Sequence, residues 1–86
     1  MKKGMKQKVL NYTAIFEPAE EGGFNVHFSA LPGCVTFGKD LKHARKMARE
    51  ALDLWLETMI EMRGKIPVEK QKPTIDSFRV FMPTRS

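Results

Sequence analysis

The sequence contains a single cysteine, and this scarcity excludes two common ways of stabilising a small protein. Cys34 cannot form a disulfide within the chain, and no Cys-X-X-Cys pair or Cys/His cluster with zinc-ligand spacing accompanies it. Long apolar runs are also missing, since no stretch approaches the ~18 uninterrupted apolar residues of a membrane-spanning helix. No apolar signal core follows the basic N-terminus. We therefore expect a cytoplasmic protein.

Motifs for catalysis are missing as well. The sequence has no GxxxxGK[ST], HExxH or GxSxG pattern. Its two histidines, His27 and His43, share no motif spacing and have no nucleophile close by in the sequence. Cys34 follows Pro-Gly, and we interpret it as a small buried apolar residue, the usual state of a free cysteine. We expect no enzymatic activity, no cofactor and no metal site.

The composition nevertheless supports one small core. Apolar residues make up 42% of 86 residues, with six Phe, one Tyr and one Trp, which favours a single globular domain over residues 1–86 and argues against disorder. The net charge is +5, which permits binding to nucleic acid or to an acidic partner. Residues 1–8 carry four lysines and no acid, and we expect them to form a basic flexible tail.

Alternating apolar and polar residues predict three strands in the first half of the chain. The expected strands cover residues 9–17, 24–29 and 34–37. Turn-forming residues separate them, at 18–23 with its Gly22-Gly23 pair and at 31–33 with Pro-Gly. Short turns between such strands favour antiparallel pairing.

The period then changes to that of a helix. Asp40 is a suitable N-cap, and apolar residues recur at spacings of three and four from Leu41 onward, until Gly64 offers a C′ residue. The helix is therefore expected to span about 23 residues, or ~34 Å. Alternation returns at Phe78–Met82 and predicts a last strand. The predicted fold is α+β, in the order β-β-β-α-β, with the helix packed on one face of the sheet.

The charges of the predicted helix are distributed unusually. Basic residues gather in and just before its first half: Lys39, Lys42, Arg45, Lys46 and Arg49. Acidic residues follow in its second half, with Asp53, Glu57 and Glu61 at i, i+4 spacing. The helix dipole favours the opposite arrangement. A solvated polar face explains the pattern, and so does a surface that a partner binds: acids for a basic protein, or bases for nucleic acid.

One helix cannot cover both faces of the sheet. The second face is expected to hold apolar residues, among them Ile15 and Phe81, with Val9, Thr13 and either Val35 or Thr36. A half-apolar exposed face on a small domain predicts burial by a partner or by another copy. We expect at least a dimer, and we expect Ile15, Phe81 and the three helix acids to contact partners.

The order of these segments resembles the HicB-like antitoxin family of bacterial type II toxin–antitoxin systems. The similar stretches are Tyr12-Thr-Ala-Ile-Phe-Glu, Glu21-Gly-Gly-Phe-Asn-Val-His-Phe, Leu31-Pro-Gly-Cys-Val-Thr-Phe-Gly38, a helix with Arg49-Glu-Ala-Leu, and Gly64-Lys-Ile-Pro67. The resemblance implies a partial RNase H-like fold, homo-oligomers (dimer or tetramer), and neutralisation of a small basic HicA-like toxin, an mRNA interferase, by masking its RNA-binding surface.

Two other functions stay open at this point. Many members of the family carry a C-terminal DNA-binding domain, and no such domain is expected here, which argues against direct DNA binding. A nucleic-acid-binding module would use the N-terminal lysines and the basic first half of the helix. A degenerate nuclease is the third alternative, although the fold alone does not imply that activity.

Overall fold

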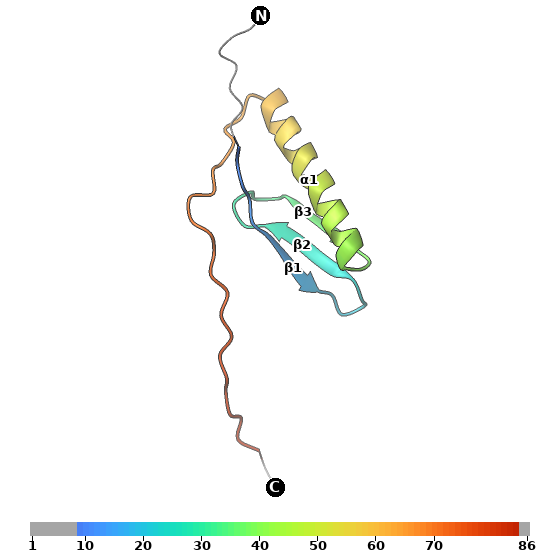
Figure 1. The fold of residues 1–86 in the computed structure, drawn as a ribbon, viewed down its shortest axis with the longest axis vertical. Helices are drawn as coiled ribbons and strands as arrows, with labels where there is room; N and C mark the ends of the chain where they lie inside the picture. The colour runs from blue at the N-terminus through green and yellow to red at the C-terminus, as the bar shows by residue number, and fades with distance from the viewer. Residues whose placement is uncertain (1–8, 85–86) are drawn as a thin grey trace, which may run out of the picture.

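The computed structural model describes residues 9–84, and the basic tail expected at residues 1–8 lies outside them. Its elements are β1 (Ala14–Pro18), β2 (Phe24–Phe28), β3 (Val35–Gly38) and α1 (Leu41–Glu61). The strands form one antiparallel sheet in the order β1-β2-β3 (Figure 1). The predicted class, α+β with a three-stranded antiparallel sheet and one long helix, is confirmed.

The first hairpin has the turn chemistry expected from its glycines. Ala19 donates its N–H to the carbonyl of Gly23 at 2.9 Å, and Gly22 donates to the carbonyl of Ala19 at 3.0 Å. Gly22 and Gly23 both have positive φ, which costs glycine little. The register pairs Ala14 with Phe28 and Pro18 with Phe24. Pro18 thus ends the strand rather than starting the turn, as suits an edge strand.

The first strand begins later than predicted. Residues 9–13 lack strand pairing although they continue the alternation of β1. Tyr12 packs against the core, whereas Val9 is 84% exposed. Alternation reports which residues can pack, but a strand also needs a neighbour, and β2 ends opposite Ala14.

Helix α1 is held tightly at its start. Asp40 caps it, its Oδ1 accepting from the N–H of His43 at 2.8 Å, as predicted. Gly38, at the end of β3, lies so close to the helix that a Cβ there would be 2.2 Å from Ala44 Cα. The absence of a side chain at Gly38 therefore permits the contact between β3 and α1.

The C-terminus of α1 lies slightly before the predicted position, and its C′ residue is Arg63 rather than Gly64. Gly64 donates to the carbonyl of Met59 at 2.9 Å and Arg63 to that of Ile60 at 3.0 Å, a Schellman motif in which Met62 is the C-cap. The left-handed C′ residue is Arg63, with φ of 56°, and Gly64 follows it. The helix has 21 residues rather than about 23, and its left-handed residue is not a glycine.

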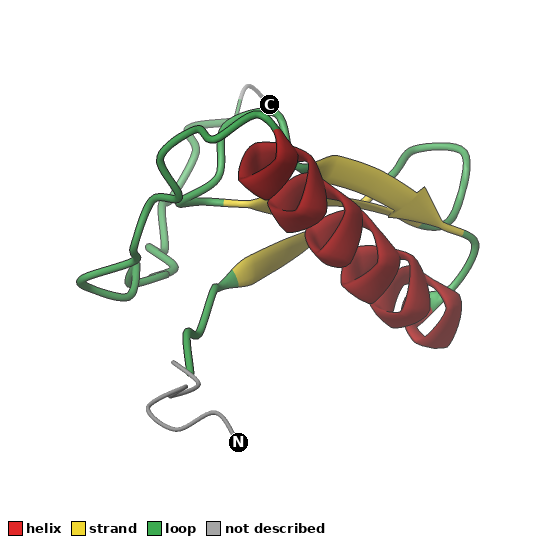
Figure 2. Ribbon diagram, turned by 90° about the horizontal axis from the view of Figure 1, so that it is seen from above, coloured by secondary structure: helices red, strands yellow, loops and turns green. Residues whose placement is uncertain are grey.

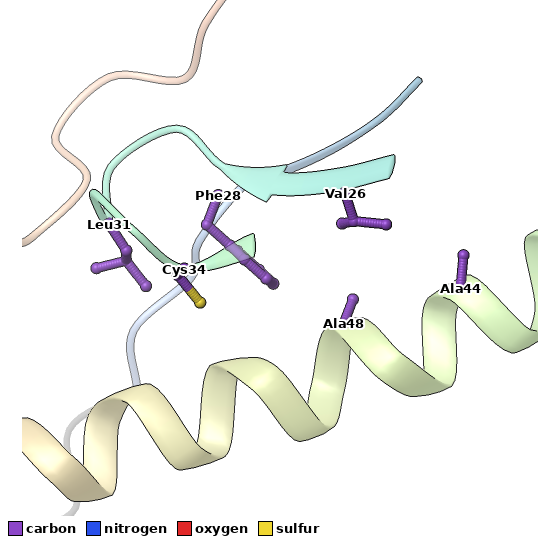
Figure 3. Packing of buried hydrophobic residues seen from close by; sticks show 6 residues of the cluster. All are labelled: Val26, Phe28, Leu31, Cys34, Ala44 and Ala48. Carbon is purple, nitrogen blue, oxygen red and sulfur yellow. The ribbon is translucent and has the colours of Figure 1, made fainter. Parts of the chain in front are cut away.

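The core lies between the sheet and one side of α1. Val26 and Phe28 of β2 face Ala44 and Ala48 of α1 (Figure 3), and Leu31 and Cys34 close one end. The two small alanines allow the helix to approach the sheet closely. Figure 2 shows α1 crossing a single face of the sheet. The other face, here called the open face, has no element of the described chain packed across it.

The predicted last strand is not formed within the described chain. Residues 78–82 have no strand pairing, and the segment from residue 70 to 84 runs away from the sheet in extended form (Figure 1). The radius of gyration, 18.0 Å, exceeds the ~12 Å of a compact domain of this length. A strand forms only beside a neighbour that accepts its hydrogen bonds, and none lies along residues 78–82 within the described chain.

Candidate protein-interaction surfaces

The residues predicted to contact partners lie in three separate places. Asp53, Glu57 and Glu61 are exposed on α1, Ile15 is half-buried on the open face, and Phe81 is exposed on the C-terminal segment. Since the helix and the open face lie on opposite sides of the sheet, these residues do not form one site. They mark separate surfaces with different chemistry.

The first surface is a charged stripe along α1. Steps of three or four residues join Lys42, Lys46, Arg49, Asp53, Glu57 and Glu61. Such spacing keeps side chains on one side of a helix, and all six are exposed. The basic residues of the alternative nucleic-acid site, Lys39, Lys42, Arg45, Lys46 and Arg49, therefore adjoin the acidic row of Asp53, Glu57 and Glu61.

Charges within the stripe are only weakly paired. Arg49 Nη1 lies 3.5 Å from Asp53 Oδ1, and both side chains are more than half exposed, so the pair adds little stability. The first turn of α1 has no acid and the last turn has no base. The stripe thus opposes the helix dipole throughout its length.

The second surface is the open face. Cross-strand register aligns Ile15, His27 and Val35 in one row, and Glu17, Asn25 and Phe37 in the next. Val35 is 63% exposed and Phe37 46%. The row of Ile15 and Val35 agrees with the expected face. Thr36 instead lies opposite Val26, on the side that α1 covers.

Phe37 was absent from the residues predicted for this face. The signal that could have found it is the burial of Cys34, because alternation along β3 then sends odd-numbered residues outward. Val35, Leu54, Trp55 and Met59 also border a shallow hollow of about 270 Å³ between α1 and β3. Apolar surface is therefore exposed on both sides of β3.

Cys34 and the two histidines have structural surroundings. The Cys34 thiol is buried and points to the carbonyl of Ala51 at 3.7 Å, and burial raises its pKa, which disfavours the reactive thiolate. His43 Nδ1 accepts from the N–H of Lys39 at 2.9 Å and so fixes the loop before α1. His27 lies on the open face between Ile15 and Val35.

A contact that the sequence did not reveal anchors the chain after the helix. Glu69 accepts two hydrogen bonds from Thr13, from the backbone N–H at 2.7 Å and from the hydroxyl at 2.5 Å. These bonds lower the pKa of the Glu69 carboxyl. Tyr12 donates its hydroxyl hydrogen to the carbonyl of Pro67 at 2.6 Å. The C-terminal segment therefore leaves the domain beside the start of β1.

Residues 9–84 contain neither a candidate metal site nor a candidate membrane-spanning helix. Among residues 9–84, no group of three or more His, Cys, Asp or Glu side chains is arranged to hold a metal ion. The helix in this part of the chain is neither long nor apolar enough to cross a membrane.

The fold defines the class: a small α+β domain with one helix on a three-stranded antiparallel sheet and with exposed charged and apolar surfaces. Residues 12–79 match the model of the HicB-like antitoxin of bacterial toxin–antitoxin systems. The chain belongs to the HicB-like antitoxin family, as the sequence resemblance predicted.

Relatives support this assignment. The chain is 38% identical over 58 residues to UPF0150 protein Ta0767 of Thermoplasma acidophilum, covering 67% of this chain and 84% of that protein. It is 36% identical over 58 residues to UPF0150 protein ssl0259 of Synechocystis, covering 67% and 80%. Antitoxin HicB 1 of Photorhabdus laumondii is 38% identical over 61 residues, which cover 71% of this chain and 39% of that protein.

Proposed function

We propose that this chain is an antitoxin that binds a small basic toxin of the HicA type, an mRNA interferase, and neutralises it by masking its RNA-binding surface. Membership of the HicB-like antitoxin family supports the antitoxin role. The similar protein named Antitoxin HicB 1 supports the toxin class. We also propose that the protein acts in the bacterial cytoplasm, where mRNA is translated, and has no catalytic step of its own.

We propose that the toxin binds the acidic row of α1, because its carboxylates are exposed and close together. Asp53, Glu57 and Glu61 present three carboxylates along one side of α1, all exposed. Glu57 and Glu61 make no ion pair within the described residues. Stacked like charges at i, i+4, set against the helix dipole, cost the free domain stability. A basic partner that neutralises them recovers this cost on binding.

Charge complementarity also favours rapid binding of the toxin. A toxin that binds RNA needs a basic surface, and the carboxylates of the acidic row attract that surface as RNA phosphates would. Long-range attraction raises the association rate and weakens as salt rises. Once docked, the helix and the sheet behind it exclude RNA by volume.

We also propose that the complete fold has an RNase H-like topology, which the three strands of the described sheet do not form by themselves. That topology needs a further strand after the helix, and residues 78–82 are the segment with the required alternation. We attach no nuclease activity to it, because a fold of this kind carries many functions.

The experiment is a paired one, in cells and in vitro. A short basic reading frame beside this one is expressed alone and together with this chain, and the purified toxin is then assayed for RNA cleavage with increasing antitoxin. We expect growth arrest by the toxin alone, its relief by this chain, and cleavage that stops near a stoichiometric ratio. Undiminished cleavage in the presence of excess folded chain would refute the proposal.

The basic half of the stripe supports the alternative function, binding of nucleic acid. Its three residues, Lys42, Lys46 and Arg49, share one side of α1, as a phosphate-binding surface requires. RNA titrations at ~50 and ~200 mM salt decide the matter, since about five phosphate contacts predict a loss of affinity of ~10²-fold or more. Absence of binding at the lower salt removes this alternative.

A further inference from the structure

The C-terminal segment carries an unusual density of exposed apolar side chains. Five of them fall within eight residues, at 71–85% exposure: Ile75, Phe78, Val80, Phe81 and Met82. Within residues 9–84, no hydrogen bond joins any residue after Glu69 to the sheet or the helix. Monomeric soluble proteins seldom leave such a stretch in water. We therefore expect another polypeptide surface to cover this segment in the functional state of the protein.

The sheet of the same chain cannot cover Phe78–Met82 in the observed arrangement. The bonds between Glu69 and Thr13 fix where the segment passes β1, and β1 continues for only five residues more, ~17 Å. Phe78 comes nine residues after Glu69, ~30 Å along an extended chain. Figure 1 shows the segment continuing past the end of β1. Phe78–Met82 is thus placed to reach another molecule.

We propose that Phe78–Met82 of one copy pairs, antiparallel, with the free edge of β1 in a second copy. Both segments are five residues long. The register sets Pro18 opposite Phe78 and Ala14 opposite Met82. It also sets Glu17 opposite Arg79 and Ile15 opposite Phe81, so that a charge pair and an apolar pair form on the open face.

This register is selective. Cross-strand neighbours of opposite charge, or both apolar, stabilise a sheet, and a shift by one residue would send every side chain to the opposite face. Phe78, Val80 and Met82 then continue the helix-covered face next to Phe16 of β1. A parallel alignment that pairs Glu17 with Arg79 would set Ile15 opposite Ser77, and it loses the apolar pair.

Three observations favour a second copy as the occupant. β1 is an edge strand of the described sheet, with unpaired backbone groups on its outer side. The segment runs in the same direction as its own β1 (Figure 1), so antiparallel pairing requires another molecule. Donor and acceptor surfaces occur on the same chain, so a twofold axis satisfies both at once.

The area is sufficient for a stable dimer. The four Phe rings of two exchanged segments alone bury on the order of 600 Å². Ile75, Val80 and Met82, together with the strand edges they cover, bring the total to the ~1,200 Å² or more of a specific interface. Ile15 and Phe81, which the sequence marked as partner contacts, become contacts between copies.

The test exchanges the charges of the pair. Glu17→Arg and Arg79→Glu are made separately, with Glu20→Arg in the hairpin turn as a control of equal charge change. Sedimentation velocity at ~1–100 µM protein and ~50 mM salt measures dimerisation. We expect the wild type to be a dimer. Each single exchange should raise the dissociation constant of the dimer about tenfold, and Glu20→Arg should leave it unchanged. An equimolar mixture of the two exchanged chains should dimerise again, as a heterodimer.

A second variant keeps the test independent of charge. Phe78→Ser/Phe81→Ser, both in the exposed segment, should give a folded monomer with the helical circular dichroism of the wild type. A wild-type monomer at ~100 µM, a dimer unaffected by this double variant, or a mixture that fails to recover dimerisation would each overturn the proposal. None of these results depends on toxin binding, so the two proposals fail separately.

Discussion

Replacing Gly38 with alanine tests how closely α1 is held to the sheet. An added Cβ would lie 2.2 Å from Ala44 Cα and 2.3 Å from Ala44 N, whereas ordinary contact is 3.4–4 Å. Both neighbours are helix backbone, so no side chain can rotate away. The first turns of α1 would have to move outward by roughly 1.2 Å, the difference between 3.4 and 2.2 Å. A gap of that size forfeits much of the dispersion attraction of the surrounding core.

We expect Gly38→Ala to lower the free energy of unfolding by about 3 kcal/mol. A chain of this length has about 4–13 kcal/mol in total, so the loss is a large share. Gly33→Ala is the matched control, since its Cβ would meet nothing within 4 Å but its φ of +85° strains a side-chain-bearing residue, at about 1–2 kcal/mol.

The assay is urea denaturation followed by helical circular dichroism and Trp55 fluorescence, at one protein concentration for all variants because dimerisation shifts apparent stability. If Gly38→Ala unfolds no more easily than Gly33→Ala, the close contact between β3 and α1 is not what holds the helix in place, and the reasoning is refuted.

Three further outcomes are expected. Arg63→Gly should stabilise the chain by about 0.5–1 kcal/mol in the same denaturation assay, because glycine adopts a φ of 56° without strain; a loss of stability would contradict this. Glu69 has a lowered pKa in the folded chain, so its contact with Thr13 stabilises above the unfolded value of about 4.5 and is lost as pH falls through the folded value; Glu69→Gln should remove this acid dependence of the Thr13 amide's hydrogen exchange. Changing all three residues of the acidic row to Gln should raise stability at low salt by about 0.5–1 kcal/mol, and an unchanged or lower value would show that the row does not oppose the helix.

Local patterns in the sequence predicted most of the fold. Asp40 and the three-to-four spacing after it located α1, and Gly22-Gly23 located the hairpin turn, because both signals depend on neighbouring residues only. The end of α1 was predicted within a few residues, but the left-handed residue is Arg63. A Schellman motif is specified by hydrogen bonds, and glycine is only its commonest residue.

Long-range contacts were the part that could not be predicted. The alternation at Phe78–Met82 shows which residues can lie on one face, but not which chain provides the neighbouring strand. The bonds between Glu69 and Thr13 join residues 56 positions apart, and no local pattern indicates them. The same limit applies to the candidate site, since charge spacing revealed the acidic row while its distance from Ile15 needed the folded sheet.

Isothermal titration with the purified toxin tests most directly whether the acidic row of α1 binds a basic toxin. Glu57→Gln/Glu61→Gln is compared with Glu20→Gln/Glu21→Gln, which removes the same charge from the hairpin turn. We predict that the helix variant binds about tenfold or more weakly at low salt, with the difference shrinking as salt rises, and that the turn variant binds like the wild type. Equal affinity of the toxin for both variants would show that the acidic row does not bind it.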